Sequence, residues 1–335
     1  MARRGLRVGL SRDFLNRDGS RAFDDEAWSR LAGAPGLELG FLEAPAFSPV
    51  TRRDVERYDV LIIKRNPVEA ALFEPDGQAL RLVVRNGAGY DHIDVEACTR
   101  AGVAVAITPG AVTSSVASAI LALVLALAHR LFERDRATRA GRWSERWERP
   151  GMDLAGRTLG IVGLGRIGLE TLRLAAPWGM RHLGYAPRPR PERYAGLGVE
   201  TVDLDTLLAQ SDFVVLCCPL DAGTRHLIDA RALARMGRQA YLVNTARGEI
   251  VDEPALVEAL RAGRIAGAGI DVFESEPPAP DHPLYGLDNV ILGSHNLAYS
   301  DGLNRAANLA AVEAVLAYAG GCLPRDVLNP GVLAG

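Results

Sequence analysis

Three ionisable side chains stand just after short apolar runs that are typical of buried strands. They are Arg247, Glu276 and His295, and the runs before them are Tyr241–Thr245, Gly269–Phe273 and Val290–Leu292. Arginine suits two-point binding of a carboxylate, and histidine exchanges a proton near neutral pH. A carboxylate against the far ring nitrogen orients the imidazole and favours its protonated form. Singly, each residue could be a surface charge or a core histidine, but together they predict an active site.

A glycine-rich turn, GLGRIG at residues 163–168, follows the apolar run Leu159–Gly163 and opens a helix pattern. The first glycine would allow a tight turn, the second a close approach of backbone to a pyrophosphate, and the third close packing of helix on strand. The helix N-terminus would offer N–H groups to the phosphates. The alternative is an ordinary strand–helix turn, and the strand–helix context favours the dinucleotide site.

These residues need a parallel sheet to bring them together. Strand-like runs alternate with helix patterns, which predicts an α/β chain with doubly wound parallel sheets. The expected strands are 7–10, 59–64, 80–85, 103–108, 159–163, 182–186, 212–218, 241–245, 269–273 and 290–292. The clearest helices are expected at 114–131, 253–262 and 303–319, and Pro109-Gly110 is expected to break the chain. Ligands should then bind at the carboxyl ends of the strands.

Length and composition fit a two-domain globular protein. The 335 residues are 48% hydrophobic and 24% charged, and the net charge of −3 gives no reason to expect nucleic-acid binding. The four cysteines show no metal-ligand spacing, so no metal is expected, and a cytoplasmic location is expected. The uncharged run 101–128 is broken by turn residues, which favours a core or dimer-interface helix over a membrane span. The charged segment 137–150, with two tryptophans, is expected on the surface or against a partner subunit.

Five motifs carry a family resemblance. They are NGAGYDHID (86–94), VGLGRIG (162–168), NTARGEIVDE (244–253), GIDVFESEPP (269–278) and His295. In this order and spacing the chain resembles the D-isomer-specific 2-hydroxyacid dehydrogenases over roughly residues 55 to 320. The resemblance implies two Rossmann-like doubly wound domains flanking a cleft. It predicts a flavodoxin-like substrate domain at 1–109 and 297–335, a dinucleotide-binding domain at 110–296, and a homodimer formed through the helix and arm near 114–150.

The resemblance also assigns residues to roles. Arg247 matches the arginine that binds the substrate carboxylate, His295 the acid/base, and Glu276 its carboxylate partner. Asp271 matches the residue that contacts the nicotinamide carboxamide. The other expected cofactor-binding residues are Gly163, Gly165, Arg166, Ile167, Gly168, Cys218, Pro219, Thr245 and Ala246. The implied reaction interconverts a 2-keto acid and a D-2-hydroxy acid by hydride transfer with NAD or NADP.

Cofactor choice depends on the end of the second strand of the dinucleotide unit, Tyr185-Ala186-Pro187-Arg188-Pro189-Arg190. NAD enzymes usually place an acid here, on the ribose 2′-hydroxyl. Ala186 would not repel a 2′-phosphate, and Arg188 or Arg190 could bind one. NADP is therefore favoured over NAD. The alternative is that both arginines are incidental and both cofactors are accepted.

Substrate contacts are expected in the first domain as well. The loop Gly87-Ala88-Gly89 matches the backbone that holds the substrate carboxylate in the family, although a simple tight turn would look the same. Lys64 and Arg85 end predicted strands and match positions that lie near a substrate phosphate in phosphoglycerate dehydrogenases. Two other functions remain open: an NAD(P)-sensing interaction protein of the corepressor type, and a relative acting on formate or phosphite.

Overall fold

The computed structural model describes residues 5–74 and 77–333, which form two compact units. Unit 1 comprises residues 1–112 and 299–335, and unit 2 comprises residues 113–298. The chain therefore crosses between the units at residues 112/113 and 298/299, whereas the predicted boundaries lie at 109/110 and 296/297. The second boundary has a local cause, because the N–H groups of Asn296 and Leu297 donate to the carboxylate of Asp271 and tie these residues to unit 2. The roles expected for the two domains remain predictions.

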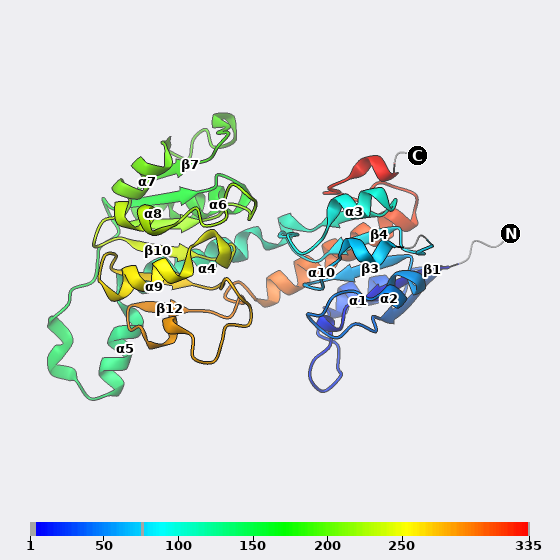
Figure 1. Cartoon of the computed structure of the whole chain (residues 1–335), viewed down its shortest axis with the longest axis horizontal. Helices are drawn as coiled ribbons and strands as arrows, with labels where there is room; N and C mark the ends of the chain where they lie inside the picture. The colour runs from blue at the N-terminus through cyan, green and yellow to red at the C-terminus, as the bar shows by residue number, and fades with distance from the viewer. Residues whose placement is uncertain (1–4, 75–76, 334–335) are drawn as a thin grey trace. The chain divides into compact units, whose positions relative to one another are not determined.

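Unit 1 is built on a five-stranded sheet in the order β2-β1-β3-β4-β5, and every strand pair is parallel (Figure 1). The strands are β1 (Leu6–Leu10), β2 (Leu37–Phe41), β3 (Val60–Ile63), β4 (Leu82–Arg85) and β5 (Ala104–Ile107). The helices are α1 (Asp25–Ala32), α2 (Arg52–Arg57), α3 (Val95–Arg100) and α10 (Asp301–Ala319), with single turns η1 (Arg12–Phe14), η2 (Ala70–Phe73) and η8 (Pro330–Leu333). This is the flavodoxin-like strand order, which puts the topological switch point between β1 and β3.

The central strand β3 shows why these runs are apolar throughout. All four of its residues are buried. Val60 and Ile62 pack in a cluster with residues of α1 and α10, whereas Leu61 and Ile63 pack in a cluster with residues of α2 and α3. Because neighbouring side chains of a strand point to opposite faces and helices cover both faces, the run cannot alternate with polar residues.

Unit 2 is built on a seven-stranded parallel sheet in the order β12-β11-β10-β9-β6-β7-β8. The strands are β6 (Thr158–Val162), β7 (Arg181–Tyr185), β8 (Val199–Thr201), β9 (Phe213–Leu216), β10 (Tyr241–Asn244), β11 (Gly267–Ile270) and β12 (Val290–Leu292). The helices are α4 (Pro109–Ala128, begun in unit 1), α5 (Leu131–Arg139), α6 (Arg166–Ala175), α7 (Leu204–Gln210), α8 (Ala230–Arg235) and α9 (Glu253–Arg261). Single turns are η3 (Trp143–Trp147), η4 (Ala176–Trp178), η5 (Pro191–Arg193), η6 (Gly248–Ile250) and η7 (Pro283–Gly286).

Strand order in unit 2 reverses at β6, because the chain continues outward through β7 and β8 on one side and through β9 to β12 on the other. The expected ligand crevice lies at this reversal, at the carboxyl ends of β6 and β9. The predicted α/β class with doubly wound parallel sheets is confirmed in both units.

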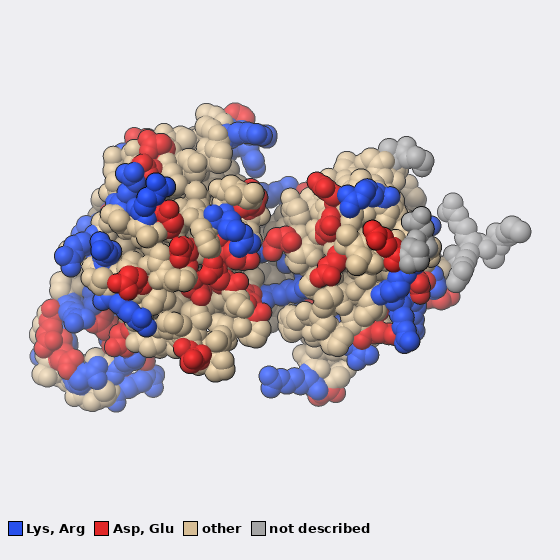
Figure 2. Space-filling model, in the orientation of Figure 1, with Lys and Arg blue, Asp and Glu red and all other residues tan. Residues whose placement is uncertain are grey.

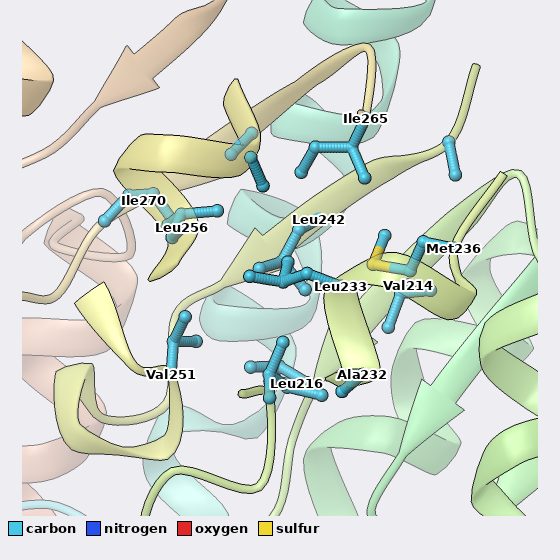
Figure 3. Packing of buried hydrophobic residues seen from close by; sticks show 14 of the residues in the cluster. Val214, Leu216, Ala232, Leu233, Met236, Leu242, Val251, Leu256, Ile265 and Ile270 are labelled. Carbon is cyan, nitrogen blue, oxygen red and sulfur yellow. The ribbon is translucent and has the colours of Figure 1, made fainter. Parts of the chain in front are cut away.

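Both faces of the unit 2 sheet are covered. On one face, side chains of β9, β10 and β11 pack against α7, α8 and α9; Figure 3 shows Leu242 beside Leu233, Leu216 beside Ala232 and Leu256 beside Ile270. On the other face, α4 and α6 pack against β6, β9 and β10. The sheet is therefore a rigid support for the loops at its edge.

Two strands and one helix start differ from the sequence prediction. β2 and β8 were not predicted because they are edge strands without a long apolar run. The expectation that Pro109-Gly110 breaks the chain is wrong, since α4 begins at Pro109. Proline suits the first turn of a helix, where its missing N–H would have no partner within the helix.

Helix α4 is the one described helix that is long and apolar enough to cross a membrane, and half of its most apolar window is buried. Ile120, Leu123 and Val124 belong to the core cluster on the α4 face of the sheet. Packing against β6, β9 and β10 accounts for the apolar residues on the buried face of this helix.

The segment after α4 forms a surface arm, defined as residues 131–147. None of the residues of α5 and η3 is buried, and Trp143 and Trp147 are 65% and 82% exposed. The arm thus presents large apolar side chains without cover from its own chain.

Candidate active site

Arg247 lies in the loop between β10 and η6, and this loop is tightly held. The buried side chain of Asn244 donates from Nδ2 to the Arg247 carbonyl over 2.8 Å and accepts the Ala246 N–H over 3.0 Å. The Arg247 guanidinium donates to the Ala246 carbonyl over 2.7 Å. A Cβ at Gly248 would overlap the carbonyl of Phe273. The arginine is therefore anchored directly beside the loop that follows β11.

Glu276 and His295 form a hydrogen-bonded pair between the loops after β11 and β12. Nδ1 of His295 lies 2.8 Å from Oε2 and 3.0 Å from Oε1 of Glu276. Oε1 also accepts the N–H of Phe273 over 3.2 Å. A carboxylate facing Nδ1 favours the tautomer that donates from Nδ1, and it can stabilise positive charge on the ring. Both side chains are partly solvent-accessible.

His295 has a left-handed backbone, with φ of 55°. Non-glycine residues rarely adopt this conformation, and such strain concentrates at functional sites. The carbonyl of Asp271 accepts the His295 N–H over 2.7 Å, and the Asp271 carboxylate accepts the N–H of Asn296 over 3.1 Å. Burial raises the pKa of Asp271, and the hydrogen bonds from Asn296 and Leu297 oppose that shift. Asp271, which the resemblance assigns to the nicotinamide, thus also holds the histidine loop.

The glycine-rich turn lies between β6 and α6, and its three glycines meet different surroundings. Gly163 has φ of 107°, and a Cβ there would be 2.6 Å from the backbone nitrogen of Cys218. A Cβ at Gly168 would overlap the carbonyl of Gly163. At Gly165, a Cβ would meet no heavy atom within 4 Å, and no side chain caps the start of α6. The first turn of α6, with Arg166 and Ile167, is thus open to an anion, so these residues fit a dinucleotide pyrophosphate.

The second strand of unit 2 ends beside two exposed arginines. Ala186 directly follows β7 and is partly buried, and Arg188 and Arg190 are exposed. Neither arginine makes an ion pair within residues 5–74 and 77–333. Two cations without a partner carboxylate near the carboxyl end of this strand can receive an anionic group.

The remaining predicted cofactor residues follow β9, which pairs with β6, and β10, which pairs with β9 on its other side. They are Cys218, Pro219, Thr245 and Ala246. Burial raises the pKa of the Cys218 thiol to about 11, so the thiol is neutral at physiological pH. A neutral thiol is a weak nucleophile, which leaves Cys218 a lining role.

The predicted substrate loop lies in unit 1, after β4. Gly87 has φ of 136°, and its N–H donates to Oγ1 of Thr108 over 2.6 Å. The N–H groups of Ala88 and Gly89 donate to no other group within the described residues. Of the three amides predicted to contact an anion, that of Gly87 is already engaged, and those of Ala88 and Gly89 are available.

Lys64 and Arg85 follow β3 and end β4 in unit 1. The Lys64 ammonium donates to the Asp13 carbonyl over 3.3 Å and lies 4.5 Å from the centre of the Phe14 ring. Burial lowers the pKa of Lys64, and Asp13 opposes this shift. The guanidinium of Arg85 donates to the carbonyl of Asn86. These cations lie at the edge where the switch point of unit 1 is expected to bind ligands.

Some residues at these sheet edges were not identified from the sequence. Asp13 and Phe14 follow β1, so the strand-end rule applied to the first strand would have found them. His226, whose ring contacts Glu274, lies in the loop between β9 and α8, and no sequence pattern marks it. Within the part of the chain that the structure describes, no group of three His, Cys, Asp or Glu residues could hold a metal ion.

The sequence model described as "D-isomer specific 2-hydroxyacid dehydrogenase, NAD binding domain" matches residues 121–296. A glyoxylate reductase from Korarchaeum cryptofilum is 41% identical over 319 residues, covering 94% of this chain and 96% of that protein. A D-3-phosphoglycerate dehydrogenase from Archaeoglobus fulgidus is 37% identical over 83% of this chain and 52% of its own length. Among solved structures, D-lactate dehydrogenase from Aquifex aeolicus with NAD and lactic acid is 26% identical, covers 96% of this chain and 99% of that chain, and has a TM-score of 0.82.

Proposed function

Because the chain belongs to the D-isomer-specific 2-hydroxyacid dehydrogenase family, we propose that it reduces small 2-keto acids at a site formed by Arg247, Glu276 and His295. Membership makes it an NAD(P)-dependent oxidoreductase that interconverts 2-keto acids and D-2-hydroxy acids. The observation that carries the assignment of the site is the 2.8 Å contact between His295 Nδ1 and Glu276 Oε2, on loops adjoining that of Arg247.

The dinucleotide, when bound, supplies or accepts the hydride. Gly163, Gly165 and the first turn of α6 would hold its pyrophosphate, because the surface over Gly165 is open and no side chain caps the helix. Asp271, at the end of β11, would contact the nicotinamide amide while keeping the histidine loop in place.

Arg247 would bind the carboxylate of the keto acid through its guanidinium fork. Its loop is anchored by Asn244 and by the close packing of Gly248, so the backbone that carries the guanidinium is already in place before substrate binds. His295 would donate a proton from Nε2 to the developing alkoxide, since Nδ1 faces Glu276. Glu276 would stabilise the imidazolium before this proton transfer. The transfer completes the reduction to the hydroxy acid.

We expect NADP to be preferred over NAD. Ala186 places no carboxylate at the end of β7, and Arg188 and Arg190 are exposed there. Replacing Ala186 by Asp should shift the ratio of kcat/KM values about tenfold toward NADH, because a carboxylate repels a 2′-phosphate and accepts a hydrogen bond from a 2′-hydroxyl. An unchanged ratio, measured from NADPH and NADH oxidation, would show that this position does not set the preference.

Glyoxylate is the first substrate to test, because the relatives of about 40% identity carry the name glyoxylate reductase. Lys64 and Arg85 would extend the range to keto acids with a polar or anionic group on the third carbon, such as hydroxypyruvate and 3-phosphohydroxypyruvate. The amides of Ala88 and Gly89 would contribute to carboxylate binding.

A homodimer in the cytoplasm is part of the proposal. The surface arm exposes Trp143 and Trp147, and large exposed apolar side chains mark association surfaces. The four cysteines are free, which suits a reducing compartment. On the face shown in Figure 2, acidic and basic side chains are interspersed, so no single-sign field suggests nucleic acid as a partner.

The central experiment compares the wild-type protein with Arg247→Ala in the reduction of glyoxylate, hydroxypyruvate and 3-phosphohydroxypyruvate. Removing the guanidinium leaves the substrate carboxylate without its partner, so kcat/KM should fall about 30-fold or more. Dinucleotide binding, followed by NADPH fluorescence, should stay within twofold. Full activity of Arg247→Ala would remove its role, and absence of turnover in the wild type would remove the proposed substrates.

A further inference from the structure

Two carboxylates stand two residues apart in the loop after β11, and each contacts a different histidine. Glu276 contacts His295, whereas Oε1 of Glu274 contacts Nε2 of His226. We propose that the His226–Glu274 pair positions the Glu276 carboxylate against His295 during reduction. This proposal rests on the proposed function and adds two positioning residues to its site.

His226 is fixed to the segment that follows Arg247. Its N–H donates to the Glu249 carbonyl over 2.8 Å. Two residues on, Ile228 bridges to Val251, and its N–H donates to the Ile250 carbonyl over 3.0 Å. The loop that carries His226 therefore moves with the segment just after Arg247.

The backbone of His226 is left-handed, with φ of 51°. His226 and His295 thus share this sparsely used conformation, and both rings contact a glutamate of the 274–276 segment. Such a conformation persists only where surrounding contacts hold it. The carbonyl of Glu249 and the side chain of Glu274 are two of those contacts.

Glu274 is held from its backbone side as well. Its N–H donates to Oε2 of Glu253 over 3.3 Å, and Oε1 of Glu253 lies 2.7 Å from Nε2 of His282. The His282 and Glu253 side chains are only 11% and 16% exposed, so this second pair is part of the packed interior. The 273–276 segment is thus bound to the interior on one side and to His226 on the other.

The His226–Glu274 pair is more exposed than the His282–Glu253 pair, and this difference bears on what each pair does. The side chains of His226 and Glu274 are 44% and 27% exposed. A pair this accessible adds little to the free energy of unfolding. Its effect should instead be on the placement of Glu276, two residues away, because a small displacement of a catalytic group has a large effect on rate.

The test uses His226→Asn and Glu274→Gln in the full-length protein. Asparagine tolerates left-handed backbone, so His226→Asn removes the contact without adding strain. We expect kcat for glyoxylate reduction to fall about tenfold with His226→Asn, with the KM for glyoxylate and the thermal midpoint nearly unchanged. Glu274→Gln, which keeps a hydrogen-bond acceptor, should retain most of the activity, whereas Glu274→Ala should match His226→Asn.

A double-variant cycle shows whether the pair acts through Glu276. In a Glu276→Gln background, His226→Asn should cause almost no further loss of kcat, because the group that it positions has lost its charge. The matched control is Asp205→Asn, which breaks the exposed Asp205–Arg235 ion pair in the same unit and should leave kcat unchanged.

The outcomes separate this proposal from the proposed function. Losses that multiply in the Glu276→Gln background, or a wild-type kcat in His226→Asn, would overturn the positioning role alone. A fall in the thermal midpoint that accounts for the lost activity would make the pair structural and also overturn it. If wild-type protein reduces none of the keto acids while Asp205→Asn and wild type bind NADPH equally, the proposed function itself fails.

Discussion

The carboxyl edges of the two sheets carry different chemistry. In unit 2, Arg247, Glu276 and His295 stand on three successive loops that hydrogen bonds and tight glycine packing tie to one another. In unit 1, the corresponding edge gathers Lys64 and Arg85 around the carbonyls of Asp13 and Asn86. One edge holds a histidine–glutamate pair in a set geometry, and the other presents cationic groups.

From this difference we expect the unit 2 edge to contribute to proton transfer and the unit 1 edge to substrate recognition. The rate of proton transfer is sensitive to changes of about a few tenths of an ångström in the donor–acceptor distance, so the loops that carry the two groups must be held firmly together. Recognition of a substrate side group requires charge near the right place and tolerates looser positioning. Changes to the Glu276–His295 pair should therefore alter kcat, and changes to Lys64 or Arg85 should alter which acid is bound.

The largest expected effect is that of His295→Gln. Loss of the proton donor should lower kcat about 10²- to 10⁴-fold for every keto acid, because general acid catalysis contributes about this factor. Stopped-flow or steady-state NADPH oxidation measures it, with NADPH binding as the control for folding. A variant that loses only affinity for substrate would break the contrast between the two edges.

Lys64→Met should have a smaller and selective effect. The KM for 3-phosphohydroxypyruvate should rise about tenfold, and the KM for glyoxylate should change less than twofold, since glyoxylate has no second anionic group. Steady-state kinetics with both substrates on the same preparation tests this. Equal losses for both would mean that Lys64 supports the loop instead of recognising the side group.

The smallest effect is a pH dependence of the same contact. Burial lowers the pKa of Lys64, so its positive charge is lost as pH rises, earlier than for a solvent-exposed lysine. The KM for 3-phosphohydroxypyruvate should therefore increase between neutral pH and about pH 10, and the KM for glyoxylate should not. In Lys64→Arg the increase should disappear, because the guanidinium stays charged; an identical pH profile in both proteins would contradict the role of Lys64.

Much of the site could be predicted because its residues sit at positions that sequence patterns mark. Arg247, Asp271 and His295 each follow a strand with a continuous apolar run, and a parallel sheet aligns those ends. The glycine turn at 163–168 is flanked by a strand pattern and a helix pattern, so the sequence alone indicated a dinucleotide site. His226 could not be found this way, because its contact with Glu274 spans 48 residues and joins two loops without periodic patterning.

The sequence by itself determined the class of the fold, the order of most of its strands and the chemical types available for catalysis, since these depend on local patterning and on motif spacing. Only the tertiary structure decided which polar groups are already engaged. It showed that Gly87 donates to Thr108, that the Asp271 carboxylate holds the loop of His295, and that Glu274 contacts His226. Hydrogen bonding between loops depends on how helices and strands pack, and no single stretch of chain encodes it.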